Sequence, residues 1–395
     1  MLGRHIPILK TILAIAGFLT TLTNSFAHAQ LRAGILVPDP NYSERIATYD
    51  VVVFCRLVDG PRAKPVGDGS YLYEVTEILK GSDSLKKQPA ATTPFRFEAF
   101  SPSGKPDDSV YFAGALSEDH SLAWDVVTDV NDRRREYLRI LAKPLSGNGT
   151  RVTSLLSFLD APENEFPESF SLDLNLELLA VPYHEIRRAR AALPIARIRN
   201  WINDPKTVDD RYLVCLRLLG ACGTKEDLPS VKSVVFGKEK RHRDALSEST
   251  ACYLRLGGEA VLPEIEAAYL KPAPGKRIDY WESHKALLGV SEVVRDSEMI
   301  SRERQLALFR PLLDQPVLSI GIVVLELARL EDWESTARMI ELSRKLPMES
   351  TERSSRGAVA HFLRRSPRPE AKVRLAELTK LDPRAVKESE KEQTP

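Results

Sequence analysis

Residues 212–220 read Tyr-Leu-Val-Cys-Leu-Arg-Leu-Leu-Gly, an apolar helical stretch that ends in a leucine followed by a small residue. The same ending recurs at steps of 37, 32 and 39 residues, and a fifth candidate, Leu363, follows after 36 more. The recurring endings are Leu219-Gly220, Leu256-Gly257, Leu288-Gly289 and Leu327-Ala328. A period of this length is typical of stacked two-helix repeats. We therefore predict an α-solenoid in the second half of the chain.

A second apolar stripe follows each of these helices at helical spacing. The stripes are Leu228, Val231 and Val235; Leu262, Ile265 and Tyr269; Leu306, Phe309 and Leu313; and Met339, Leu342 and Leu346. One stripe on each of two helices closes a layer of core. Irregular helical bundles carry such stripes too. The period and the repeated ending are what favour a solenoid over a bundle.

The first half of the chain has a period of two between Tyr49 and Val127. Val51 to Cys55 is a continuous apolar run, which indicates a strand buried on both faces. Alternating patterns predict four further strands, at 71–80, 95–99, 110–114 and 122–126. Five short strands with Gly, Pro and Ser between them fit a small antiparallel barrel or sandwich. Residues 132–141 then return to helical spacing.

Six segments follow from these patterns, with the best domain boundary at Pro-Leu-Ser-Gly-Asn-Gly, residues 144–149. We expect a signal peptide at 1–29, an extended leader at 30–48, a β-barrel-like domain with a C-terminal helix at 49–145, an irregular helical region at 146–206, the solenoid at 207–383 and a disordered tail at 384–395. The tail is polar and has no apolar face to bury.

The first 29 residues have the three parts of a secretory signal peptide. Arg4, His5 and Lys10 give a positive start, residues 12–22 are apolar, and Ala27-His28-Ala29 is a cleavage motif. We predict cleavage between Ala29 and Gln30 and a periplasmic or secreted protein. The alternative is a membrane anchor. The apolar stretch is shorter than the roughly 20 residues that a spanning helix needs, so we favour cleavage, with no transmembrane segment left in the mature protein.

Charge and cysteine content narrow the function classes further. The chain has 56 basic and 55 acidic residues, and cleavage would remove Arg4 and Lys10, so the mature chain is nearly neutral. This balance argues against nucleic acid as a partner.

The chain has too few cysteines for a disulfide scaffold: Cys55, Cys215, Cys222 and Cys252. Cys215 or Cys222 would reach Cys252 if neighbouring repeats pack face to face, but we favour four buried thiols.

Two stretches resemble known families. Residues 209–235 resemble a HEAT-like repeat in their apolar first helix, the turn at 220–223, Glu226-Asp227 and the Leu228-Pro229 opening, which returns at 261–263. Residues 73–81, following 50–53, are similar to the opening hairpin of netrin/TIMP-like OB barrels. Together they resemble exported bacterial HEAT-repeat proteins with an N-terminal β-domain. Protease inhibition does not carry over, because it requires an N-terminal cysteine and disulfides.

Residues with catalytic chemistry are scattered, and no common catalytic motif is present. The densest group is 280–284, where Glu282 and His284 point to different helix faces, so packing is the simpler role. Candidate pocket residues are Trp124, Trp201, Trp281 and His284. We predict no catalytic residue, no cofactor and no metal site.

The function that fits these patterns is a non-enzymatic, exported scaffold that binds a protein partner on its solenoid surface in the cell envelope. The alternative is a ligand-binding protein or enzyme with its site at the junction of the β-domain and the helical domain, near Trp124 and Trp201. The partner, any reaction and the oligomeric state stay open at this point.

Overall fold

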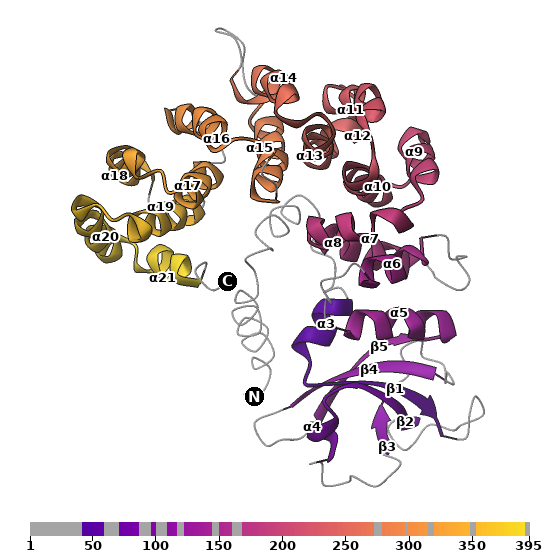
Figure 1. The fold of residues 1–395 in the computed structure, drawn as a ribbon. Coiled ribbons are helices and arrows are strands. Elements are labelled where there is room, and N and C mark those ends of the chain that lie inside the picture. Colours follow the sequence, from indigo (N-terminus) through magenta and orange to yellow (C-terminus); the bar gives the residue numbers. More distant parts are fainter. Residues whose placement is uncertain are drawn as a thin grey trace. The chain divides into compact units, whose positions relative to one another are not determined.

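A computed structural model describes residues 42–58, 71–86, 96–99, 109–116, 122–143, 150–159, 168–271, 279–296, 299–314, 320–347 and 353–391. Ala29, Gln30 and the leader up to residue 41 lie outside these ranges. The described residues form two compact units that divide between Val181 and Pro182 (Figure 1). Within the described ranges, no helix combines the length and the apolar character that crossing a membrane requires.

The first unit is built on a five-stranded antiparallel sheet in the order β3-β2-β1-β4-β5. Its strands are β1 (Val51–Leu57), β2 (Tyr71–Lys80), β3 (Arg96–Ala99), β4 (Ser109–Leu116) and β5 (Leu122–Asp129). In the central strand β1, Cys55 lies opposite Val75 of β2 and Val110 of β4. The five strands expected from the alternating pattern are therefore all present.

The expected β-barrel is wrong, because the sheet is open. β3 and β5 form its two edges, and the described strands do not pair across them. The sheet buries its faces against helices instead of curling onto itself. On one face, Val53, Cys55 and Phe112 pack with Leu85 of α4 (Ser82–Lys86). On the other face, the Arg135 guanidinium of α5 (Asp132–Ala142) lies 5.2 Å from the Phe54 ring centroid.

The leader also differs from its expected extended form. Residues 42–48 make the short helix α3 (Tyr42–Thr48), which packs against α5. The Tyr42 ring stacks on Phe170 of α7 (Glu168–Ala180), with centroids 4.8 Å apart. The helix α6 (Thr150–Leu156) completes the unit. Long-range contacts that the local sequence cannot reveal therefore fix this segment.

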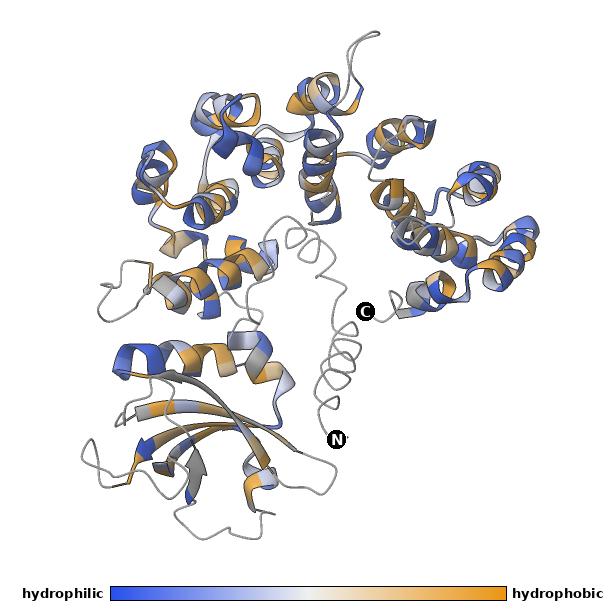
Figure 2. Cartoon of the chain, turned by 180° about the vertical axis from the view of Figure 1, so that it is seen from behind, coloured by the Kyte–Doolittle hydropathy of each residue, from blue (hydrophilic) through white to orange (hydrophobic). Residues whose placement is uncertain are grey.

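All regular elements described in the second unit are helices, arranged side by side in two rows (Figure 1). The first row comprises α10 (Asp209–Cys222), α13 (Leu246–Gly257), α15 (Tyr280–Asp296), α17 (Ile320–Arg329), α19 (Arg353–Arg365) and α21 (Pro383–Lys391). The second row comprises α9 (Ile195–Asn203), α11 (Leu228–Val235), α14 (Leu262–Ile265), α16 (Arg302–Phe309), α18 (Thr336–Lys345) and α20 (Pro369–Leu381). Many of these helices carry hydrophobic and hydrophilic residues on opposite sides (Figure 2).

Each first-row helix packs against the next one along the row. The small residue of the repeated ending explains how two of these helices approach so closely. A Cβ atom on Gly289 would lie 2.3 Å from the Ser247 carbonyl oxygen of α13. A Cβ atom on Gly220 would lie 3.4 Å from the Cys252 Cα atom of the same helix. The glycines are therefore contact points between neighbouring first-row helices.

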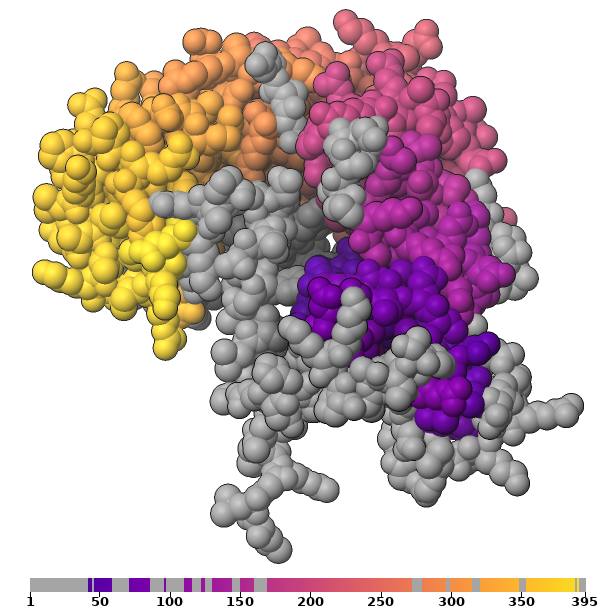
Figure 3. Space-filling view, turned by 60° about the horizontal axis from the view of Figure 1, so that its bottom comes forward, coloured from indigo at the N-terminus to yellow at the C-terminus, as the bar shows by residue number. Residues whose placement is uncertain are grey.

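The chain end differs from the expected disordered tail. Residues 383–391 form α21, which packs on α19 and buries Ala385 and Val386. Arg356 of α19 donates to the Asp382 carboxylate over 2.7 Å, and this carboxylate also accepts the Ala385 N–H. In Figure 3 the helices from α19 onward, coloured yellow, form one continuous surface. The burial of Ala385 and Val386 and the buried Arg356–Asp382 ion pair thus hold α21 in place, although its composition is polar.

Candidate binding site

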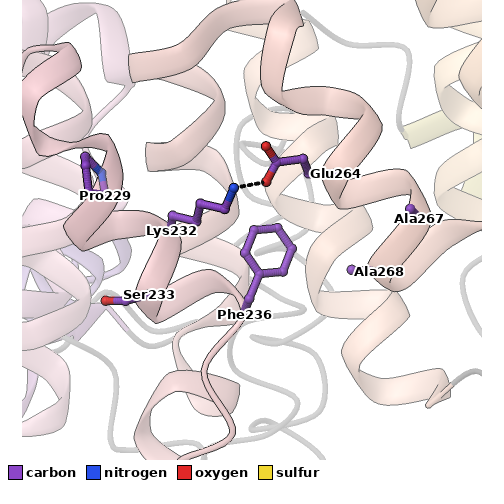
Figure 4. A pocket seen from close by; sticks show the side chains of 7 residues that line it. All are labelled: Pro229, Lys232, Ser233, Phe236, Glu264, Ala267 and Ala268. Atoms are coloured by element: carbon purple, nitrogen blue, oxygen red, sulfur yellow. Dashed lines mark ion pairs between the residues drawn. The ribbon is translucent and has the colours of Figure 1, made fainter.

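A hollow of about 620 Å³ opens between α11 and the helical segment that begins with α14 (Figure 4). Its lining residues are Pro229, Lys232, Ser233, Phe236, Glu264, Ala267 and Ala268. Both sides follow helical spacing, since the α11 residues recur at i, i+3, i+4 and i+7 and those opposite at i, i+3 and i+4. Two facing stripes of side chains therefore make this site.

The floor of the hollow is aromatic and held in place by further rings. Phe236 stacks on Tyr269, with centroids 6.1 Å apart and planes inclined by 6°. Tyr253 meets Phe236 edge-on at 6.0 Å. The Tyr269 hydroxyl donates to the Val235 carbonyl oxygen, and burial raises the pKa of Tyr269 to about 12. The phenol thus stays neutral and keeps its donor at physiological pH.

The opposite wall leaves the hollow open because it carries small side chains on an unusual turn. Ala267 and Ala268 belong to η6 (Glu266–Leu270), a π-helical turn that continues α14. Turns of this kind often occur at functional sites. The apolar stripe of Leu262, Ile265 and Tyr269 predicts one α-helix here, so the sequence pattern did not reveal this turn.

An ion pair spans the rim of the hollow. Lys232 Nζ lies 2.6 Å from Glu264 Oε2, and both side chains are about half exposed. The Tyr253 hydroxyl also donates to Glu264 over 3.3 Å. The hydrogen bond to Glu264 raises the pKa of Lys232, so this amine stays protonated and does not act as a base at neutral pH. The site thus offers an apolar floor and two fixed opposite charges, a combination suited to binding.

The structure brings together only some of the pocket candidates from the sequence. Trp281 and His284 meet edge-on at the start of α15, with ring centroids 6.3 Å apart. The Trp281 side chain is 65% exposed, whereas burial lowers the pKa of His284 and keeps its ring neutral. Trp201 on α9 has the Arg211 guanidinium 5.3 Å from its ring centroid. Trp124 belongs to the first unit.

Trp124 lies on β5 and contributes to the sheet core. Its ring meets Phe112 edge-on at 6.3 Å and fills the space that Gly114 leaves open beside it.

All four cysteines are free and buried in the structure. Burial raises the pKa of Cys252 and that of Cys215, the latter to about 12, so both thiols stay protonated. Among the described residues, no His, Cys, Asp and Glu side chains group in a way that would hold a metal ion.

A buried charge cluster joins three first-row helices, and sequence reasoning missed it. Arg217 of α10 and Arg255 of α13 both donate to Glu292 of α15, the latter over 2.8 Å. Glu248 Oε2 lies 3.7 Å from Nη1 of Arg217. Burial and the Glu292 charge raise the pKa of Glu248 to about 7. The cluster links α10, α13 and α15, and its members lie too far apart in sequence to form a motif.

Comparison of this chain with family models, curated proteins and solved structures finds no match. The function is therefore inferred from the arrangement of the residues in this chain.

Proposed function

We propose that this chain is an exported, non-enzymatic interaction protein of the cell envelope, periplasmic or secreted, whose helical unit acts as a HEAT-like α-solenoid. The packing of each first-row helix on the next supports this architecture. The open sheet of the first unit does not support the barrel part of the family resemblance, so we carry forward only the HEAT-like part.

Ion pairs between helices of the helical unit add to this support. Three aspartates, each in the turn before a following helix, bind an arginine from an earlier helix. The pairs are Arg199–Asp227, Arg310–Asp332 and Arg356–Asp382. In the first pair, the hydrogen bond from Arg199 lowers the pKa of Asp227, so the pair is ionised at neutral pH. Such links join helices that are separated in the sequence and are compatible with a repeat array.

The observation that carries the proposed binding role is the hollow beside Phe236. It presents a fixed aromatic floor with a lysine and a glutamate at its rim, which suits an apolar side chain flanked by polar groups on a protein partner. Aromatic side chains are common anchors in protein interfaces, and Phe236 offers one on an open helical surface. We therefore place the partner contact on α11 and α14.

The test is covalent capture at the hollow in the native host. A photo-crosslinking amino acid replaces Ala268 in the full chain, and the same group replaces Glu341, an exposed residue of α18, as the control. We expect a discrete, protease-sensitive crosslinked species from position 268 alone. Adding Phe236→Ala should reduce its yield by about tenfold, which corresponds to the loss of a modest aromatic anchor.

Equal crosslinking from both positions, or a yield from position 268 that Phe236→Ala leaves unchanged, would count against a specific contact here. A melting curve of the Phe236→Ala chain separates lost binding from lost folding, since a folded variant retains a cooperative transition.

A further inference from the structure

Two carboxylates of the first unit lie buried one helical turn apart. Asp173 and Glu177 of α7 are 6% and 3% exposed. Residues four apart share one face of a helix, so both carboxylates point to the same side. Buried carboxylates need partners that replace water. Here these partners come from three other helices, α3, α5 and α6.

The donors hold the first turn of α3 in place. The Tyr42 backbone N–H donates to Asp173 Oδ1 over 2.8 Å, and the Tyr137 hydroxyl of α5 donates to Oδ2 over 2.5 Å. The Ser43 hydroxyl donates to Glu177 Oε1. Asp173 and Glu177 together therefore bind the two residues with which α3 begins.

The charges around the two carboxylates do not balance. Arg151 of α6 donates to Glu177 over 3.0 Å, and the Arg134 guanidinium of α5 lies farther off, 5.5 Å from the Phe170 ring centroid. The other titratable groups that face them are Tyr137 on α5 and Glu44 on α3, and Glu44 adds negative charge. Glu177 thus has an arginine beside it, whereas the groups that act on Asp173 are neutral donors and other acids, and a buried carboxylate without a cation beside it is costly to ionise.

We propose that Asp173 and Glu177 form a proton-binding site that controls the docking of α3 on α5 and α7. The two carboxylates share one proton when α3 covers them. They lose it when α3 lifts and water reaches them. The first helix described after the predicted leader is then held more tightly as the surroundings become more acidic.

The direction follows from linkage between proton binding and docking. Burial and the neighbouring Glu177 charge raise the pKa of Asp173 to about 7, and burial raises the pKa of Glu177 as well. With α3 lifted, both groups return towards their ordinary values of about 4. The docked form thus binds more protons between pH 4 and pH 7, so docking strengthens as the pH falls through this window.

The experiment measures how often α3 opens. Ile46→Cys places a thiol at a buried position of α3 in the full chain. Its alkylation rate at pH 5.5 and pH 8 is divided by the rate in concentrated urea at the same pH, which removes the thiol's own titration. We expect protection on the order of tenfold greater at pH 5.5 than at pH 8.

Three variants of this chain identify the groups involved. Asp173→Asn should remove the pH dependence, because the amide mimics the protonated acid, and Glu177→Gln gives the same test if the first variant folds poorly. Glu44→Gln removes an acid of α3 whose charge adds to the shift of both carboxylates, so the dependence should persist but become weaker. Cys55 of β1, buried in the same unit, reports opening of the whole sheet.

Equal protection of the introduced thiol at both pH values would overturn the proposal, as would a dependence that survives in both Asp173→Asn and Glu177→Gln. Reaction of Cys55 in step with the introduced thiol would also overturn it, because the whole unit would then open rather than α3 alone.

Discussion

Arg255 links three parts of the helical unit through one side chain that is only 2% exposed. Its guanidinium donates to Glu292 over 2.8 Å and lies 3.4 Å from the ring centroid of Tyr183 on α8 (Tyr183–Arg188). The same carboxylate also accepts from Arg217. Removing Arg255 leaves the buried carboxylates with one compensating charge fewer, and this loss outweighs the modest net value of the intact contacts.

We therefore expect Arg255→Ala to lower the free energy of unfolding by about 3–5 kcal/mol, as urea denaturation would measure. The matched control is Lys240→Ala, which removes an ion pair with Asp244 whose lysine is 84% exposed. Exposed pairs contribute less than about 1 kcal/mol, so the control should unfold close to the wild type. Similar losses in both variants would contradict a special role for the buried cluster.

Glu248 makes the stability of the helical unit depend on pH. Its pKa is about 7 in the folded state and about 4.5 when unfolded, so the folded state binds more protons between these values. Stability should therefore rise as the pH falls from 8 to 5, by about 1–3 kcal/mol from this group. Glu292 does not oppose this change, because Arg217 and Arg255 lower its pKa to about 2 despite burial.

Glu248→Gln should remove that part of the slope, which urea titrations at pH 8 and pH 5 would measure. Glu370→Gln on the exposed start of α20 is the control, and it should retain the wild-type slope. Asp173 contributes a separate slope in the other unit, so Glu248→Gln and Asp173→Asn should act additively. A Glu248→Gln chain with the wild-type slope would contradict the assignment.

Among the secondary-structure elements, the sequence pattern predicts the helices and strands well where burial follows a simple period. Val51 to Cys55 reads as a strand buried on both faces, and all five residues are fully buried in β1. The helices from α10 to α20 also lie where their apolar stripes predict, except that a π-helical turn follows the short α14. These patterns need only local spacing, so one sequence suffices to read them.

Other elements depend on partners far away in the chain, which local spacing cannot reveal. α3 is held by Asp173 and Glu177, about 130 residues later. The hollow also could not be predicted from local spacing, because its two sides come from different helical segments. The sequence identifies the buried stripe of α11, but Lys232 and Phe236 become a site only because the small side chains of a π-helical turn face them.

Substitution of two glycines in first-row helices would test whether the small residue of the repeated ending is needed for close helix packing. A Cβ atom at Gly289 would meet the Ser247 carbonyl oxygen at 2.3 Å, whereas the nearest atom to one at Gly321 of α17 would be 3.6 Å away. Gly289→Ala should thus lower stability by about 1–3 kcal/mol through overpacking. Gly321→Ala should be neutral or stabilise by up to about 1 kcal/mol, because alanine favours helix.

Thermal and urea unfolding of the two glycine variants would measure this difference. A Gly289→Ala chain as stable as the Gly321→Ala chain would mean that α13 and α15 can move apart without loss. The repeated ending would then lack the packing role that we assign to it.

For the whole molecule, export is the prediction with the clearest outcome. A full chain expressed in a bacterial host should lose residues 1–29 and begin at Gln30, which intact mass and N-terminal sequencing would measure. Ala29→Arg should block cleavage, because the processing site requires a small residue there. A mature protein that keeps Met1, or one that is found only in the cytoplasm, would contradict export.

The packing of the first-row helices side by side has a mechanical consequence. Since consecutive first-row helices contact one another, a load applied along the row would pass through these contacts one after another. Each contact then yields by a small amount, and the small displacements add up over the length of the row. We expect the helical unit to stretch and recover under forces that would break a protein whose helices all share one core.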